Sequence, residues 1–186
     1  MVLSLILAAV VVMGSPGPST ISMTAVGAAY GLRRSLGYLL GLVAGTTVVL
    51  IAVAAGVVSL LLSVPRLAPV LLGASAVYML YLAFRIATAP PLSKQAGAGT
   101  PSFAGAFLLA VANPKAYLAI AAVFAGSTLD ALPKVAILIV MIVAIHVCWL
   151  LAGASLSRLF YDPVRSRIAN AAFAATLVLT TAFTFA

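Results

Sequence analysis

Two short polar interruptions inside long hydrophobic stretches carry most of the residues that could do chemistry. They are residues 14–18, Gly-Ser-Pro-Gly-Pro, and residues 113–115, Asn-Pro-Lys. Proline inside a helix removes a hydrogen bond, whereas at the first helical position it is tolerated, with Ser, Asn or Gly favoured just before it. Each interruption therefore predicts a helix that begins anew, capped by Ser15 or Gly17 in the first case and by Asn113 in the second.

A helix that begins inside an apolar segment exposes backbone N–H groups and the positive end of its dipole. Such groups should face a cavity or another helix, and a carboxylate would suit the place. The residues expected to contact that ligand are Ser15, Pro16, Gly17, Pro18, Ser19, Asn113, Pro114 and Lys115. The alternative is a structural kink at each position, satisfied by neighbouring helices.

Lys115 and His146 are ionisable residues that fall well inside apolar segments. Lys115 lies roughly 18 Å into its segment at about 1.5 Å per residue, which is far for a lysine to reach water. Because a charge there is costly, Lys115 is a candidate counter-charge for an anion; the alternative is an anchor at the headgroups. His146 is a candidate carrier of a coupling proton, or a neutral residue bonded between helices.

The composition identifies the medium around these residues. Hydrophobic residues make up 65% of the 186, and charged residues only 6%, against about 25% charged in soluble domains. A soluble fold is excluded, and at about 20 apolar residues per span the chain has room for roughly six spans. The net charge of +8 comes from basic residues scattered between apolar runs, which favours membrane-protein loops over nucleic-acid binding.

The charged residues delimit the spans of an all-α integral membrane protein. The expected transmembrane helices are residues 2–30, 36–63, 67–88, 102–127, 132–157 and 164–186. A proline-rich cytoplasmic linker, 89–101, divides the chain into a first three-helix repeat, 1–88, and a second, 102–186. An odd number of spans per repeat makes the two repeats inverted, and the interruptions then break the first and fourth helices at matching positions.

Basic residues are distributed unequally between the two sets of loops. One set holds Arg33, Arg34, Arg85, Lys94, Arg158, Arg165 and Arg167, and the other holds Arg66 and Lys134. The positive-inside rule places the richer set in the cytoplasm, so both termini are expected outside.

The residues that metal binding, ATP hydrolysis and other catalysis require are missing from the sequence. The chain has one cysteine and no phosphate-binding loop, and both acidic residues fall in expected loops. We therefore expect no metal, no cofactor, no ATPase and no enzyme. Since a cationic substrate would normally need a buried acid, a neutral or zwitterionic one is favoured.

The motifs resemble the bacterial amino-acid exporters of the LysE/RhtB type over most of the chain. The more specific matches are residues 16–19 with Gly31, Arg33, Gly37, Gly41 and Gly45 after them, and Phe103 and Gly105 with residues 113–116. Weaker matches are Gly73, Tyr78, Leu80, Tyr81, Leu82, Arg85, Trp149, Arg165, Arg167 and Asn170. The four-residue spacing of Gly37, Gly41 and Gly45 also predicts the close approach of another helix.

The resemblance implies a six-helix exporter of the bacterial inner membrane, driven by the proton or the membrane potential. Many relatives carry an acid where this chain has Thr46, so Thr46 is a further candidate substrate contact. The expected function is alternating-access export of a small neutral or zwitterionic amino acid or close derivative. The expected partners are that amino acid and the bilayer, and a homo-oligomer stays open. The alternatives are export of another solute class, a lipid-linked metabolite or an ion, or a non-transporting scaffold whose breaks enclose no cavity.

Overall fold

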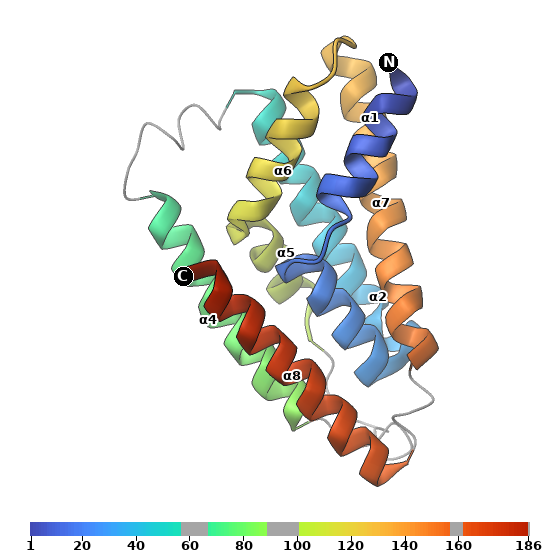
Figure 1. Cartoon of the computed structure of the whole chain (residues 1–186), viewed down its shortest axis with the longest axis vertical. Helices are drawn as coiled ribbons and strands as arrows, with labels where there is room; N and C mark the ends of the chain where they lie inside the picture. The colour runs from blue at the N-terminus through green and yellow to red at the C-terminus, as the bar shows by residue number, and fades with distance from the viewer. Residues whose placement is uncertain (57–66, 89–100, 157–161, 186) are drawn as a thin grey trace.

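The computed structural model describes residues 1–56, 67–88, 101–156 and 162–185, and all regular structure within them is helical (Figure 1). The elements are α1 (Val2–Ala8), the π-helical η1 (Ala9–Met13), α2 (Pro18–Ala54), α4 (Leu67–Ala87), α5 (Phe103–Ala112), α6 (Pro114–Ala125), α7 (Ala131–Ser155) and α8 (Pro163–Phe185). Among the described residues, α2 and α7 are long and apolar enough to cross a membrane, and α5 with α6 would make a third span bent by 60°. The prediction of an all-α membrane protein is confirmed.

The helix α2 contains a reversal of the chain at Gly31. Its backbone angles there, φ 74° and ψ 171°, lie in a region open essentially to glycine alone. The Ser35 hydroxyl then donates to the carbonyl of Val26 at 3.1 Å and to that of Gly31 at 2.7 Å, which ties the two arms together. The break between the first two expected spans is therefore in the right place. The expected loop at 31–35 is wrong, because one glycine makes the turn.

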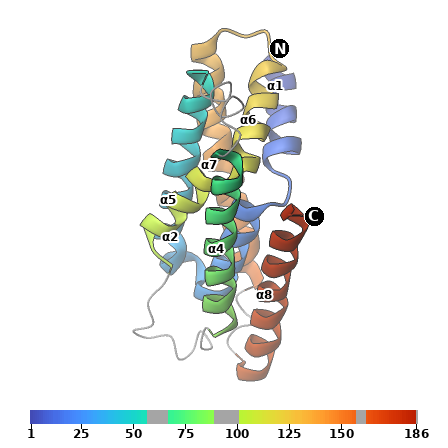
Figure 2. The ribbon, with the colours of Figure 1, turned by 90° about the vertical axis from the view of Figure 1, so that its left-hand side faces the viewer.

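Successive segments run in alternating directions through the molecule (Figure 1). The two arms of α2 pack mainly on α7 and α5, while α4 and α8 pack mainly on each other and form a pair beside them (Figure 2). The number of six spans and the inverted repeat stay predictions. The linker expected at 89–101 lies outside the described residues except for Pro101, and so do residues 57–63 of the second expected span.

Local capping explains where several helices begin. The Ser102 hydroxyl accepts from the N–H of Gly105 at 3.1 Å before α5, and the Asp162 carboxylate accepts from Val164 and Arg165 at 2.9 Å before α8. These are favoured N-cap residues.

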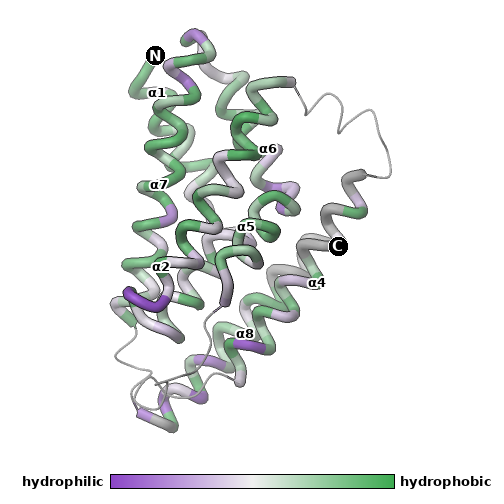
Figure 3. Tube along the Cα trace, turned by 180° about the vertical axis from the view of Figure 1, so that it is seen from behind, coloured by the Kyte–Doolittle hydropathy of each residue, from purple (hydrophilic) through white to green (hydrophobic). Residues whose placement is uncertain are grey.

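Basic residues that the sequence analysis assigned to one set of loops lie at the same end of the molecule. Arg33 and Arg34 follow the reversal in α2, Arg85 lies in the last turn of α4, and α8 starts nearby (Figure 1). Hydropathy mapped on the chain shows apolar residues along most of the helices, with hydrophilic ones at the lower ends of α2 and α8 and also at the upper end of the molecule (Figure 3). Arg66, Lys94 and Arg158 lie outside the described residues. The orientation in the membrane stays a prediction.

Two apolar clusters divide the core into an upper and a lower part. One gathers residues of the lower part of α2 with α4, α5 and α8, including Met23, Tyr38 and Leu109. The other joins Leu5 and Val49 with residues of α6 and α7 near the N-terminal end. The two helix breaks lie between these clusters, so polar groups at the breaks are enclosed by apolar side chains on both sides.

Two of the three glycines spaced four residues apart, Gly41 and Gly45, allow another helix to approach α2 closely. A methyl group on Gly41 or Gly45 would collide with α5, at the carbonyl of Phe103 or of Phe107, so both glycines set how closely α2 and α5 approach. Gly37 is exposed, and an added methyl group would meet no described residue within 4 Å. The expectation was wrong for Gly37, because the α5 helix does not extend past that turn of α2.

Replacing Gly41 with alanine should therefore destabilise the fold by about 1–3 kcal/mol through overpacking. Gly37→Ala is the matched control, and we expect it to leave stability unchanged or slightly raised, since alanine favours helix over glycine. Thermal unfolding in detergent, followed by size-exclusion chromatography, measures both variants. Equal losses at the two positions would contradict the packing described here.

Candidate functional site

The first break separates η1, which ends at Met13, from α2, which begins at Pro18. Gly17 is the N-cap; its N–H donates to the Thr20 hydroxyl at 2.9 Å, and that hydroxyl donates back to the Gly17 carbonyl at 3.1 Å. Of the two starts that the sequence allowed, Gly17 is therefore right and Ser15 is wrong. The Thr20 hydroxyl thus satisfies the N–H of the N-cap itself, but glycine has no side chain to cap the first turn of α2.

The positive end of α2 is left available by this arrangement. Ser19 and Thr20 hold the second and third helical positions, whose N–H groups have no acceptor inside a helix. No acceptor for either N–H is found elsewhere in the described part of the chain. Both residues are buried. Two backbone donors and a helix dipole therefore converge there without a partner, as an anion site requires.

The second break is different, because its N–H groups are satisfied by the chain itself. Asn113 is the N-cap of α6: its side-chain oxygen accepts from the N–H of Lys115 at 3.1 Å, and its carbonyl accepts from that of Ala116 at 3.0 Å. The expectation that both breaks expose N–H groups is wrong for this one. The Asn113 amide instead donates to the Ser19 hydroxyl at 3.0 Å, which joins the two breaks in the buried interior.

Lys115 reaches from the second break to the first. Its ammonium group donates to the carbonyl of Ser15 at 2.7 Å, to the Ser15 hydroxyl at 2.8 Å and to the carbonyl of Pro16 at 2.7 Å. The two carbonyls follow the C-terminal end of η1, where a cation is favoured by the helix dipole. All three ammonium protons are used by the protein in this conformation. The positive charge still lies on the cavity wall described next.

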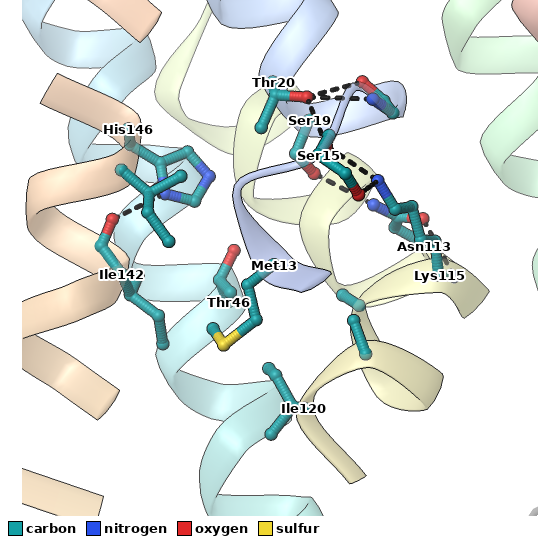
Figure 4. Close-up of a pocket in the computed structure, with 14 residues that line it drawn as sticks. Met13, Ser15, Ser19, Thr20, Thr46, Asn113, Lys115, Ile120, Ile142 and His146 are labelled. Atoms are coloured by element: carbon teal, nitrogen blue, oxygen red, sulfur yellow. Dashed lines mark hydrogen bonds between the residues drawn. The ribbon is translucent and has the colours of Figure 1, made fainter. Parts of the chain in front are cut away.

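A cavity of about 40 Å³ lies where the two breaks meet (Figure 4), which is room for roughly three water molecules. The residues expected from the sequence that line it are Ser15, Gly17, Ser19, Thr46, Asn113, Lys115 and His146. Three expected residues, Pro16, Pro18 and Pro114, do not line it. Pro18 and Pro114 start α2 and α6, and Pro16 contributes only its carbonyl to Lys115.

The wall opposite Lys115 carries hydrogen-bonding atoms that have no partner. His146 on α7 and Thr46 on α2 are only 4% and 5% exposed. The His146 Nδ1 lies 2.8 Å from the carbonyl of Ile142, while its Nε2 and the Thr46 hydroxyl find no partner among the described residues. Buried polar atoms in native proteins are usually paired, so unpaired ones that line a cavity indicate a place for a ligand or for water.

The comparisons with known proteins agree with this architecture. The family described as LysE type translocator matches residues 10–186. The chain belongs to the LysE-type translocators. The cysteine/O-acetylserine efflux protein of Escherichia coli (strain K12) is 33% identical over 156 residues, covering 78% of each chain. The protein of that name from Salmonella choleraesuis (strain SC-B67) is 32% identical over 153 residues, again 78% of each chain. No solved structure matches.

In this LysE-type translocator the structure also shows site residues that the sequence analysis missed. The cavity is further lined by Met13, Thr20, Ala116, Ala119, Ile120, Ile142 and Ile145. Trp149 donates its indole N–H to the carbonyl of Gly14 at 3.1 Å and so holds the first break against α7. The spacing of Thr20, three residues after the N-cap, was a usable signal. For Trp149 the signal was an indole N–H that needs a partner at membrane depth.

Asn113 should contribute more to stability than an ordinary cap of this translocator. Asn113→Ala removes the cap of α6, worth about 1 kcal/mol, and also the buried bond to Ser19, worth about 1 kcal/mol more. Ser102→Ala is the matched control, because it removes an exposed cap alone. We expect a loss in free energy of unfolding about twice as large for Asn113→Ala in thermal and denaturant unfolding. Equal losses would argue against the bond between the breaks.

Proposed function

We propose that this LysE-type translocator exports a small neutral or zwitterionic amino acid, or a close derivative, across the bacterial cytoplasmic membrane by alternating access. The observation that carries the proposal is the cavity between the two helix breaks, where donors without acceptors lie beside a half-buried lysine. The relatives described above support the class of solute, since their name gives cysteine and O-acetylserine, both neutral amino acids. A scaffold without transport would need no such cavity.

The carboxylate of the substrate binds at the first break. The N–H groups of Ser19 and Thr20 are the donors without acceptors, and the charge of Lys115 stabilises the anion from the adjoining wall. Because Lys115 is held by Ser15 and Pro16, the substrate either binds beside this ammonium group or exchanges one of its protein contacts. Gly17, Pro18, Asn113 and Pro114 fix the positions of these groups.

The absence of an acid from the cavity wall fits a neutral solute. The resemblance to the family implies an acid where this chain has Thr46, and the cavity-lining residues that the structure describes include no carboxylate. A cationic substrate would leave its extra charge unpaired in a buried place, which costs several kcal/mol. His146 is the titratable residue on the wall opposite Lys115, and we assign it the role of carrying the coupling proton.

The position of the cavity between two apolar clusters supports alternating access. In this proposal the clusters open in turn, and opening one while the other stays packed exposes the site to one side of the membrane at a time. The bonds of Lys115 and Asn113 join the first repeat to the second at the breaks, and these are the contacts that a movement of one repeat against the other must change.

The experiment is efflux from proteoliposomes loaded with a labelled mixture of amino acids under an imposed pH gradient. We expect selective loss of one or a few neutral amino acids, faster with the gradient than without it. Retention of every amino acid by vesicles that hold folded protein would contradict the proposal. It would favour another class of solute, such as a lipid-linked metabolite or an ion.

A further inference from the structure

The cavity has two chemically different walls, and the second one is not used by carboxylate binding. Lys115 and Asn113 lie on one side, while His146 lies across the cavity on α7 (Figure 4). Lys115 and the N-terminus of α2 offer positive charge and donors. His146 and Thr46 offer the atoms that remain without partners in the described chain.

The hydrogen bond at Nδ1 fixes what the His146 ring can do. A carbonyl oxygen only accepts, so the Nδ1 that lies 2.8 Å from the Ile142 carbonyl carries a proton. In the neutral ring the Nε2 then has only a lone pair. The Nε2 can therefore accept a hydrogen bond from a ligand but cannot donate one.

Thr46 departs from the behaviour of other threonines in this chain. Thr24 and Thr176 donate back to the carbonyl four residues earlier, at 3.0 and 2.9 Å, as threonine in a helix commonly does. The Thr46 hydroxyl makes no such bond although it is buried and lines the cavity. Its oxygen is therefore a second acceptor available to a ligand.

We propose that the His146 Nε2 and the Thr46 hydroxyl bind the α-ammonium group of the substrate, and that a proton competes with the ammonium group for that nitrogen. This inference rests on the proposed function and assigns the second end of the zwitterion. The carboxylate lies at the positive wall and the ammonium group at the acceptor wall. A solute with both groups satisfies both walls at once.

Competition at one nitrogen couples transport to the proton. A protonated His146 presents an N–H and a positive charge at Nε2, so it repels the ammonium group that the neutral ring accepts. The ring holds either a proton or a substrate, never both, and each turnover exchanges one for the other. Lys115 on α6 is the charged residue that faces His146 across the cavity, and the lining residues of η1, α2 and α7 carry no fixed charge.

The test uses counterflow of labelled cysteine into proteoliposomes with equal pH on both sides, in the presence of reductant. For wild-type protein, the KM for cysteine should rise about tenfold for each pH unit below the pKa of His146, and kcat should not change. His146→Gln keeps an acceptor oxygen that does not titrate, so its KM should not depend on pH. A KM that follows pH alike in both proteins contradicts the competition.

The ammonium assignment is tested with 3-mercaptopropionate, which keeps the thiol and carboxylate but lacks the amino group. Thr46→Val and His146→Leu should raise the KM for cysteine about tenfold or more and leave inhibition by 3-mercaptopropionate unchanged. Thr46→Ser should restore the wild-type KM. Thr47→Val is the matched control, because Thr47 is the next residue on α2 and does not line the cavity.

The outcomes separate this inference from the proposed function. If the protein exchanges cysteine but the variants weaken the binding of cysteine and of 3-mercaptopropionate equally, the ammonium assignment is wrong. Amino-acid export is then still supported. Wild-type protein that exchanges neither cysteine nor any other amino acid contradicts the proposed function and this inference with it.

Discussion

Lys115→Ala should abolish transport while the protein stays folded in the membrane. The variant removes the charge from the positive wall of the cavity and all three hydrogen bonds to Ser15 and Pro16. An interaction of a substrate carboxylate with a charged group contributes about 1.5–3 kcal/mol, and its loss lowers substrate binding by about tenfold to a hundredfold, which leaves little transport. Ser15 lines the cavity and the Pro16 carbonyl is bonded at an exposed position, so water can replace the ammonium group at these acceptors and folding is affected much less.

Lys134→Ala is the matched control for this prediction. Lys134 is buried, whereas Lys115 is half-buried, and like Lys115 it donates to a carbonyl near a helix end, that of Phe124 at 3.0 Å, but it lies outside the cavity. We expect its variant to transport at a rate close to wild type. The measurement is efflux of labelled amino acid per folded protein, with folding checked by size-exclusion chromatography. Full transport by Lys115→Ala would overturn the role given to this lysine.

Gly17→Ala should have the second-largest effect, and for a steric reason. An added methyl group would lie 2.7 Å from both Cδ and Nζ of Lys115, closer than the two side chains can approach. The backbone of Gly17 is extended, with φ −175° and ψ −178°, so alanine fits the conformation itself. The flexible lysine must therefore move aside, at little cost to folding but with the loss of its bonds to Ser15 and Pro16. Transport should fall about tenfold or more, since one bond of this kind corresponds to about 1.4 kcal/mol or more.

A double variant separates this steric effect from other causes. In the Lys115→Ala background the methyl group has nothing to displace, so Gly17→Ala should change neither the residual transport nor the melting temperature further. Gly37→Ala serves again as a glycine variant with open space around it. If Gly17→Ala transports normally at a normal expression level, the position of the Lys115 side chain does not require the absence of a side chain at residue 17.

Proline and cap residues made the helix breaks predictable from the sequence. Asn113 and Pro114 start α6 as expected, and Gly17 and Pro18 start α2 as one of two expected alternatives. The expected ends of the other helices that the structure describes differ by a few residues, except that the second expected span, 36–63, ends nine residues early, because α2 stops at Ala54. These features depend on the missing N–H of proline and on side chains within three residues, so neighbouring sequence is enough to define them.

The contents of the cavity were partly predictable for a different reason. A lysine and a histidine inside apolar segments are costly, and that cost indicated Lys115 and His146 before any contact was known. Thr46 was indicated only by the resemblance to the family. Thr20 and Trp149, which complete the first break, were missed because their polar atoms also suit ordinary helix positions.

The sequence by itself determined the medium, the helical class, the places where helices break and the family. Only the tertiary structure decided that Lys115 binds Ser15 and Pro16 about a hundred residues away in sequence, that of the two breaks only the one before α2 leaves N–H groups without an acceptor in the described part of the chain, and that His146 and Thr46 face one cavity. The physical reason is the uniform hydrophobicity of these helices. In a soluble helix the apolar stripe shows which side is buried, but here lipid-facing and core-facing sides are both apolar. The rotation of each helix about its axis, and so the meeting of its polar atoms with those of another helix, is set by packing between distant segments.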